Sequence, residues 1–188
     1  MIASESVLID GIREVKKIDF ILVLEKDTIF HYLRDLGFSD MLVSGRGQTD
    51  LSTRVLLRKL RDHFKRIPFY CLVDANLSGA YIFSTYRFGS EDKAYDSLCL
   101  TVPNSEYIGL DIQDVPEENL KCMEAKDLKL AEKMLKKTDD NSLVYLRSNL
   151  INMQDNEKKA DMEMIMSEHN LEDYIIEKMK CIYARLKD

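Results

Sequence analysis

The sequence predicts an α/β domain built on a parallel sheet, with a helical extension at its C-terminal end. Two short apolar runs, residues 19–24 (DFILVL) and 69–73 (FYCLV), lack the alternation of a half-exposed strand, so we expect each to be a strand covered on both faces. Helix-patterned stretches at about 28–36 and 51–64 separate the two runs, which favours βαβ units. From about residue 127 the pattern is helical with little strand signal.

Further elements complete this architecture. Weaker strand patterns lie near 41–44 and 106–110. The clearest helix of the tail spans 171–187, where apolar residues recur at helical spacing, a pattern typical of a face packed on the core or on a partner. We therefore expect a first domain over residues 1–125 and a helical extension over 126–188 that packs on it.

The composition indicates an ordered globular protein. Of the 188 residues, 45% are hydrophobic and 32% are charged, and the net charge of -6 argues against a protein that coats nucleic acid by net charge alone. The four cysteines are far apart without metal-ligand spacing, which fits a reducing compartment, and the three histidines are isolated. No signal peptide or run long enough to cross a bilayer occurs, so we expect an intracellular, soluble protein without a membrane partner.

Each of the two strong strand patterns ends on an acid, Glu25 and Asp74. In an open α/β sheet the site lies beyond the carboxyl ends of the strands, which is where these acids fall. Carboxylate oxygens at adjacent strand ends can hold Mg²⁺ through one or two ligands, with water in the other positions. The alternative is that an acid at a strand end simply caps the next helix, as Asp27 and Asp74 could both do.

Residues 43–50 form a second candidate segment, which leaves a predicted strand and passes Gly45 and Gly47 before a helix. Glycines permit close approach of the backbone, and Asp50 or Ser52 can cap the helix. The segment lacks the pattern of a phosphate-binding P-loop, so nucleotide binding is not indicated. It is otherwise a plain turn from strand to helix.

The helix after that turn carries a basic stripe. Arg54, Arg58, Arg61 and Lys65 lie on a narrow angular sector, while leucines cluster on another side. Such a stripe is either a solvated face or a track for the phosphates of DNA. Both interpretations are open.

Three segments taken together resemble a known family. ILVLEKDTIFHYL (21–33), SGRGQTDLSTR (44–54) and VDANLSGAYIFSTYRFGS (73–90), in this order, look like the Toprim domain found in the A subunit of type IIB topoisomerase (topoisomerase VI) and in its meiotic double-strand-break relatives. The likeness covers about residues 6–115, and KKADMEMIMSEHNLEDYIIEKM (158–179) is similar to the closing helices of the family.

The resemblance implies a Rossmann-like Toprim parallel sheet flanked by helices, a homodimer, and Mg²⁺-assisted transesterification of double-stranded DNA. By position Glu25 matches the metal-binding glutamate of the family and Asp74 matches the first aspartate of its DxD pair. The metal would polarise the phosphoryl oxygens. With the basic stripe, the resemblance makes these residues DNA-proximal candidates: Arg46, Arg54, Arg58, Arg61, Lys65 and Arg87.

The motif departs from the family at its second acid. The sequence reads Asp74-Ala75-Asn76, so a neutral amide replaces a carboxylate. The resemblance implies that one metal is held by the glutamate and first aspartate and a second by the two aspartates. Asn76 is therefore a doubtful metal ligand, and we expect weakened Mg²⁺ binding at the second position.

The catalytic tyrosine of the family lies on a separate winged-helix domain, and it becomes joined to the 5′ end of the broken DNA. None of the nine tyrosines of this chain matches it, so no catalytic residue can be assigned and we expect the winged-helix domain to be absent from this sequence. The winged-helix domain would then belong either to a longer form of this chain, of which the sequence is a truncated product, or to a partner chain. An ATPase B-type subunit is a further partner that the resemblance implies. It also implies a nuclear, chromosome-associated protein if the source is eukaryotic, and a cytoplasmic one otherwise.

Three functional hypotheses follow. The first is the Mg²⁺-binding Toprim portion of a DNA transesterase that makes double-strand breaks of the meiotic recombination type. The second is a catalytically decayed module kept for dimerisation or DNA docking, which Asn76 and the unmatched tyrosine favour. The third, a Toprim nuclease that uses water as the nucleophile, ranks below these because the YRFGS and GRGQTD segments resemble the topoisomerase family more than Toprim nucleases.

Overall fold

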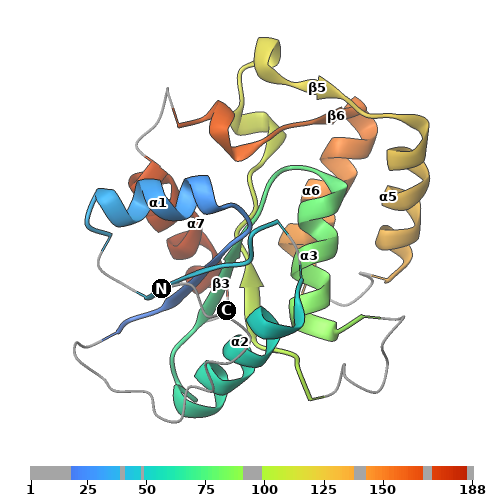
Figure 1. The fold of residues 1–188 in the computed structure, drawn as a ribbon. Coiled ribbons are helices and arrows are strands. Elements are labelled where there is room, and N and C mark those ends of the chain that lie inside the picture. The colour runs from blue at the N-terminus through green and yellow to red at the C-terminus, as the bar shows by residue number, and fades with distance from the viewer. Residues whose placement is uncertain are drawn as a thin grey trace.

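A parallel sheet forms the centre of the computed structural model (Figure 1). The structure describes residues 18–38, 41–47, 49–90, 99–137, 143–166 and 171–185. Within these residues the sheet has four strands in the order β2-β1-β3-β4, all parallel. The strands are β1 (Ile21–Leu24), β2 (Met41–Ser44), β3 (Phe69–Leu72) and β4 (Ser105–Tyr107). The predicted α/β fold with a parallel sheet is confirmed.

The two central strands are the two strong apolar runs. Every residue of β1 and β3 is buried, as expected for strands covered on both faces. The predicted strand at 41–44 is confirmed as β2. The last strand begins slightly before the predicted 106–110, and its pairing continues past β4, because Ile108 and Leu110 donate main-chain hydrogen bonds to Cys71 and Val73, each 3.0 Å long.

Helices cover both faces of the sheet. The crossovers are α1 (Asp27–Asp35), α2 (Leu51–His63) and α3 (Leu77–Phe88). The tail supplies α5 (Ala125–Lys137), α6 (Val144–Asn156) and α7 (Leu171–Arg185). Figure 1 shows α1 and α7 on one side of the sheet, and α3 and α6 on the other with α5 outside them. The helical tail is thus confirmed, with the last two residues of the predicted 171–187 helix outside the described part.

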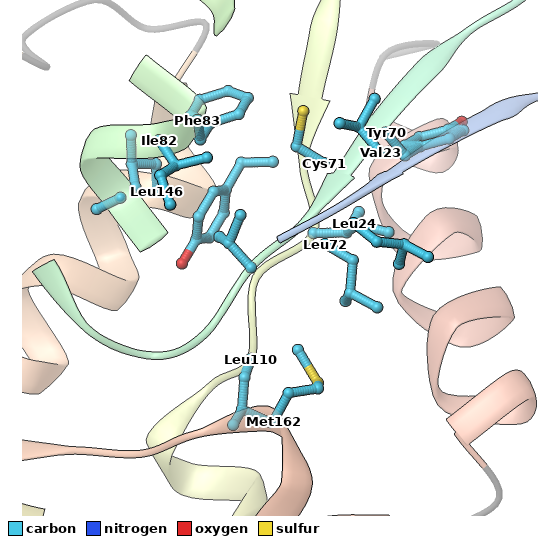
Figure 2. Close-up of a cluster of buried hydrophobic side chains, with 14 of the residues drawn as sticks. Val23, Leu24, Tyr70, Cys71, Leu72, Ile82, Phe83, Leu110, Leu146 and Met162 are labelled. Atoms are coloured by element: carbon cyan, nitrogen blue, oxygen red, sulfur yellow. The ribbon is translucent and has the colours of Figure 1, made fainter. Parts of the chain in front are cut away.

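The core joins these layers. Figure 2 shows Ile82 and Phe83 of α3 beside Leu146 of α6 on one face of the sheet, with Leu24 and Leu72 directed to the other side. All five side chains are at most 4% exposed. The tail therefore packs on the same hydrophobic core as the sheet.

A small antiparallel ribbon was not predicted. It pairs β5 (Lys121–Cys122) with β6 (Lys158–Lys159). Two-residue strands of this kind give no hydrophobic alternation that a sequence pattern could reveal. Three 3₁₀ turns, Ile112–Asp114, Glu117–Asn119 and Met162–Met164, complete the described elements. None of the described helices is both long and apolar enough to span a bilayer.

The strand order creates a switch point between β1 and β3. The chain leaves β1 toward β2 on one side, and it leaves β3 toward β4 on the other. Right-handed crossovers then place the following helices on opposite faces, and in open α/β sheets ligands bind beyond the carboxyl ends of the strands at such a point. The segments that follow β1 and β3 carry Glu25 and Asp74.

Candidate metal site at the sheet edge

The structure brings Glu25 and Asp74 together at this switch point. The Glu25 main-chain N–H donates to the Leu72 carbonyl (3.2 Å), and the Asp74 main-chain N–H donates to Oε2 of Glu25 (3.0 Å). Glu25 is only 8% exposed and Asp74 only 3%. Two acids from strands 49 residues apart therefore share one buried edge, held by main-chain hydrogen bonds.

Burial raises the pKa of both acids, and repulsion from a neighbouring carboxylate adds to each shift. Loss of hydration, followed by the charge of Asp74, raises the pKa of Glu25 to about 7. Burial also raises the pKa of Asp74, although hydrogen bonds from Lys26 and Met162 oppose the shift. A carboxylate pair with raised pKa values is stabilised by a nearby cation, which lets both acids ionise at neutral pH.

Lys26 supplies one positive charge at the edge. Its Nζ lies 2.8 Å from Oδ2 of Asp74 and 2.6 Å from Oε2 of Glu163. Burial favours the neutral amine, but these two carboxylates outweigh it and raise the pKa of Lys26 above its ordinary value. Thr28 donates a further hydrogen bond to Oε1 of Glu163 (3.2 Å). No local pattern indicated this role of Lys26, because its partner Glu163 lies 137 residues away.

Asn76, not Asp74, caps the following helix. Its Oδ1 accepts a 2.8 Å hydrogen bond from the Gly79 N–H at the start of α3, and its Nδ2 donates to Oδ2 of Asp74 (3.3 Å). The Gly79 N–H needs an acceptor, so it fixes which way the amide points. The capping alternative for Asp74 is therefore wrong, and the amide presents its NH₂, rather than its oxygen, to the acid pair.

Asp27 does not cap its helix either. The residue at the cap position of α1 is Lys26, whose side chain makes no capping hydrogen bond. Asp27 instead accepts a hydrogen bond from the Ser44 hydroxyl and lies 3.7 Å from the Arg46 guanidinium. The prediction that Asp27 caps α1 is therefore wrong, because its side chain is hydrogen-bonded to Ser44 at the end of β2.

The turn at residues 43–50 enters α2 as expected. Asp50 is the cap of α2 and accepts hydrogen bonds from the main chain and hydroxyl of Thr53, at 2.9 and 2.6 Å. Gly47 has a φ of 73°, and Arg46 has a φ of 52°. Gln48 lies outside the described residues. The turn therefore brings Arg46 beside Asp27. It also lies next to the end of the sheet that carries Glu25 and Asp74, which we call the metal edge.

Gly79 allows α3 to approach the acid turn. A Cβ at this position would lie 2.6 Å from the Asp74 carbonyl oxygen and 3.1 Å from its nitrogen. No side chain fits between these backbones. No sequence pattern indicated a role for Gly79. The absence of a side chain at this position sets the distance between α3 and the turn that carries Asp74.

A segment of the tail also reaches the edge. The Ala160 N–H donates to the Ala75 carbonyl (2.9 Å), and the Met162 N–H donates to Oδ1 of Asp74 (2.9 Å). The residue between them, Asp161, is ion-paired with Lys121. Both oxygens of Asp74 are thus hydrogen-bonded, one of them by a residue 88 positions further along the chain. Local patterns carry no information on such a contact.

The donor set suits one hard divalent cation. No three His, Cys, Asp or Glu side chains within the described ranges converge as a complete set of metal ligands. Mg²⁺ does not require such a set, because it keeps several waters and binds through one or two carboxylates. Glu25 and Asp74 provide these, and burial, which raises the pKa of both, disfavours their ionisation unless a cation lies close by. The residues present therefore fit a single Mg²⁺.

The basic residues of α2 do not form one open ridge. Arg54 is 3% exposed, and its Nε and Nη2 have no hydrogen-bond partner. Arg58 donates to the Cys99 carbonyl and Arg61 to the Thr101 carbonyl, each at 3.2 Å. Part of the basic stripe therefore contacts the segment at residues 99–102. Helical periodicity could not reveal where that segment lies.

The remaining DNA-proximal candidates are dispersed. Lys65 is exposed just beyond the end of α2. Arg87 is buried, donates to the Ser105 carbonyl and lies 3.5 Å from Glu106, so it joins α3 to β4. Arg46 is exposed and lies near Asp27. Among the six candidates, Arg46 combines exposure with a position beside the acid edge.

Metal binding should depend on pH through Glu25. This carboxyl must lose its proton to ligate a cation, and its pKa is raised to about 7. We expect Mg²⁺ affinity to be nearly constant above this pH and to fall by up to about tenfold per pH unit below it. Calorimetry at pH 6, 7 and 8 in two buffers of different ionisation enthalpy would measure the affinity and the proton released. Equal affinity at pH 6 and 8 would contradict this expectation.

Comparison with known proteins identifies one family, both by a family model and by individual relatives. The family model for the Toprim domain of Spo11 and of the A subunit of topoisomerase 6 matches residues 20–179. Meiotic recombination protein SPO11 of Homo sapiens is 32% identical over 168 residues, which cover 84% of this chain and 42% of that protein. Meiotic recombination protein SPO11-1 of Oryza sativa subsp. indica is 37% identical over 69% of this chain and 36% of its own length.

An archaeal relative is similar over a shorter part. The A subunit of type 2 DNA topoisomerase 6 from Sulfurisphaera tokodaii is 39% identical over 101 residues, or 52% of this chain and 26% of that protein. The chain therefore spans well under half of the length of these curated relatives.

Proposed function

Because the chain belongs to the Toprim-domain family of Spo11 and the A subunit of topoisomerase 6, we propose that it is the Mg²⁺-binding portion of a DNA transesterase that makes double-strand breaks. The reaction would proceed through a tyrosine–DNA link, as in meiotic recombination. The observation that carries the proposal is the contact between Glu25 and Asp74 at the switch point of the sheet.

The acids would hold Mg²⁺ while Lys26 orients Asp74. When bound there, the cation supplies charge that polarises a phosphoryl oxygen and stabilises the charge that develops on it. Lys26 fixes one oxygen of Asp74 and the Met162 N–H fixes the other, so this carboxylate is held in one orientation. Arg46, exposed beside the same edge, would contact a neighbouring phosphate.

The nucleophile would come from outside these 188 residues. We place it on a winged-helix domain, within a longer form of the protein or on a partner chain. None of the nine tyrosines matches the nucleophile of the family by position. Tyr70, Tyr86 and Tyr107 are at most 5% exposed and pack in the core, whereas Tyr81 on α3 is 47% exposed. A homodimer would set two such sites on the two strands of the duplex, and an ATPase B-type subunit is the further proposed partner. A nuclear location follows if the source is eukaryotic.

The direct test is formation of a covalent adduct. The chain, assembled with a protein that supplies the winged-helix tyrosine, would be incubated with double-stranded DNA and Mg²⁺. We expect a protein–DNA adduct that is lost in Glu25→Ala and kept in Glu132→Ala, which changes an exposed glutamate of α5. Absence of an adduct from an assembly that binds both DNA and Mg²⁺ would refute the proposed activity.

A second candidate function has a specific observation in its favour. The Asn76 oxygen is used to cap α3, so this position offers no oxygen to a second metal. This favours a decayed module that serves dimerisation or DNA docking. Cleavage that depends on Mg²⁺ and disappears in Glu25→Ala would exclude it.

Restoring the acid at position 76 should strengthen metal binding. Asn76→Asp places a carboxylate next to Asp74, and an aspartate caps a helix as well as an asparagine does. We expect Mg²⁺ affinity to increase by about tenfold in calorimetry. The control Asn152→Asp adds the same charge on α6. An affinity equal to that of the unchanged protein would show that Asn76 does not limit metal binding.

A further inference from the structure

The tail segment at residues 160–162 lies across the metal edge. Ala75 and Ala160 form an antiparallel bridge, and the Met162 N–H donates to Asp74. The Met162 side chain is 2% exposed and lies beside Leu110 beyond the ends of the strands (Figure 2). The main chain is therefore anchored on both sides of Asp161.

This anchoring places Asp161 opposite Asp74. In an antiparallel bridge between Ala75 and Ala160, the residue after Ala160 faces the residue before Ala75. Burial opposes ionisation of Asp161, but hydrogen bonds from Lys121 and Asn76 and the charge of Lys26 lower its pKa. Asp161 therefore stands on the side of the bridge that carries Asp74, and its carboxylate accepts a hydrogen bond from Lys121.

The partner of Asp161 is a weak competitor for a cation. Lys121 is 51% exposed and Asp161 is 28% exposed, and an ion pair between exposed groups contributes little. Glu163, in contrast, is bonded to both Lys26 and Thr28. Of the two acids in this segment, Asp161 is the one that can exchange its partner at low cost.

The charged side chains at the metal edge have a net negative charge that a divalent cation could balance. Four carboxylates, those of Glu25, Asp74, Asp161 and Glu163, face the two ammonium groups of Lys26 and Lys121. When Glu25 is ionised, the negative excess equals the charge of one Mg²⁺. The Asn76 amide, lying between Asp74 and Asp161, contributes no charge of its own.

We propose that Asp161 is the third carboxylate of the metal site and supplies, from the tail of the chain, the acid that is missing at position 76. This inference rests on the proposed function, since it concerns the same Mg²⁺ site. In the described, metal-free structure the three carboxylates do not converge on one point, so Asp161 would have to release Lys121 and turn toward the cation, binding it directly or through one of its waters. The site would then be built from three segments, two at strand ends and one from the tail.

Two variants separate a ligand from a structural clamp. In Asp161→Asn we expect Mg²⁺ affinity to fall about tenfold in calorimetry on the full chain. In Lys121→Met the carboxylate is released from its partner, so we expect affinity to stay the same or increase. If Asp161 only clamps the tail through Lys121, both variants weaken binding alike, which would overturn the inference.

Controls keep the test specific. Asp155→Asn removes an exposed acid of α6 and should leave affinity unchanged. The midpoint of thermal unfolding in EDTA should be the same for Asp161→Asn and the unchanged protein, and Asn76→Asp added to Asp161→Asn should restore affinity. Unchanged affinity in Asp161→Asn overturns this inference alone, whereas absence of Mg²⁺ binding by the unchanged protein overturns the proposed function as well.

Discussion

Glu25→Gln is expected to abolish most Mg²⁺ binding and at the same time to stabilise the metal-free protein. The amide keeps the shape of the side chain and can still accept the Asp74 N–H, but it carries no charge for a cation. Loss of a direct ligand should lower Mg²⁺ affinity on the order of 100-fold. Calorimetry would measure this, with Glu132→Gln on α5 as the matched control.

The gain in stability follows from the pKa of Glu25. Because that pKa is raised to about 7 in the folded protein, ionised Glu25 destabilises the fold at pH 8, and the penalty disappears as the pH falls toward the unfolded value of 4.5. We expect Glu25→Gln to increase the free energy of unfolding on the order of 1–3 kcal/mol at pH 8 in EDTA. At pH 4.5 the difference should be small. Urea denaturation that shows a loss of stability at pH 8 would contradict the buried, repelled state of this carboxyl.

Gly79→Ala should destabilise the protein and damage the metal edge together. At an ordinary helical position this change is favourable by up to about 1 kcal/mol. Here the new Cβ would lie 2.6 Å from the Asp74 carbonyl oxygen, and this atom belongs to a main chain that is held by hydrogen bonds on several sides. We expect a net loss of about 2 kcal/mol in the free energy of unfolding. Displacement of Asp74 should also weaken Mg²⁺ binding.

The neighbouring position provides the comparison. Ser78 is exposed in the first turn of α3, so Ser78→Ala should change stability by less than about 0.5 kcal/mol and leave metal affinity intact. Urea denaturation and calorimetry on both variants would distinguish them. A Gly79→Ala protein that is as stable as Ser78→Ala would show that α3 can move away from the turn without penalty.

The sheet and the meeting of its two acids were predictable for one physical reason. A strand covered on both faces must be apolar throughout, so β1 and β3 are visible as unbroken hydrophobic runs. Parallel strands end at the same edge, and the residues that follow them, Glu25 and Asp74, therefore meet. The cap of α2 by Asp50 was also accessible, because capping depends on a few adjacent residues.

The rest of the site depends on contacts that local patterns do not encode. Lys26 is a neighbour of Glu25 in sequence, but its role depends on Glu163. The helical spacing of the basic residues in α2 was correct, yet it did not show that Arg54 is buried. Periodicity gives the relative angle of side chains on a helix and leaves open which angle faces the protein.

The hydrogen bond from the Met162 N–H to Asp74 has a consequence for biosynthesis. A nascent chain that has emerged only as far as α6 contains every strand of the central sheet, but Asp74 still lacks this donor and Lys26 still lacks Glu163. Since chains emerge from their N-terminal end, the sheet can form well before its acidic edge is organised. The acidic edge of the sheet is thus completed only after residues 160–163 have been synthesised.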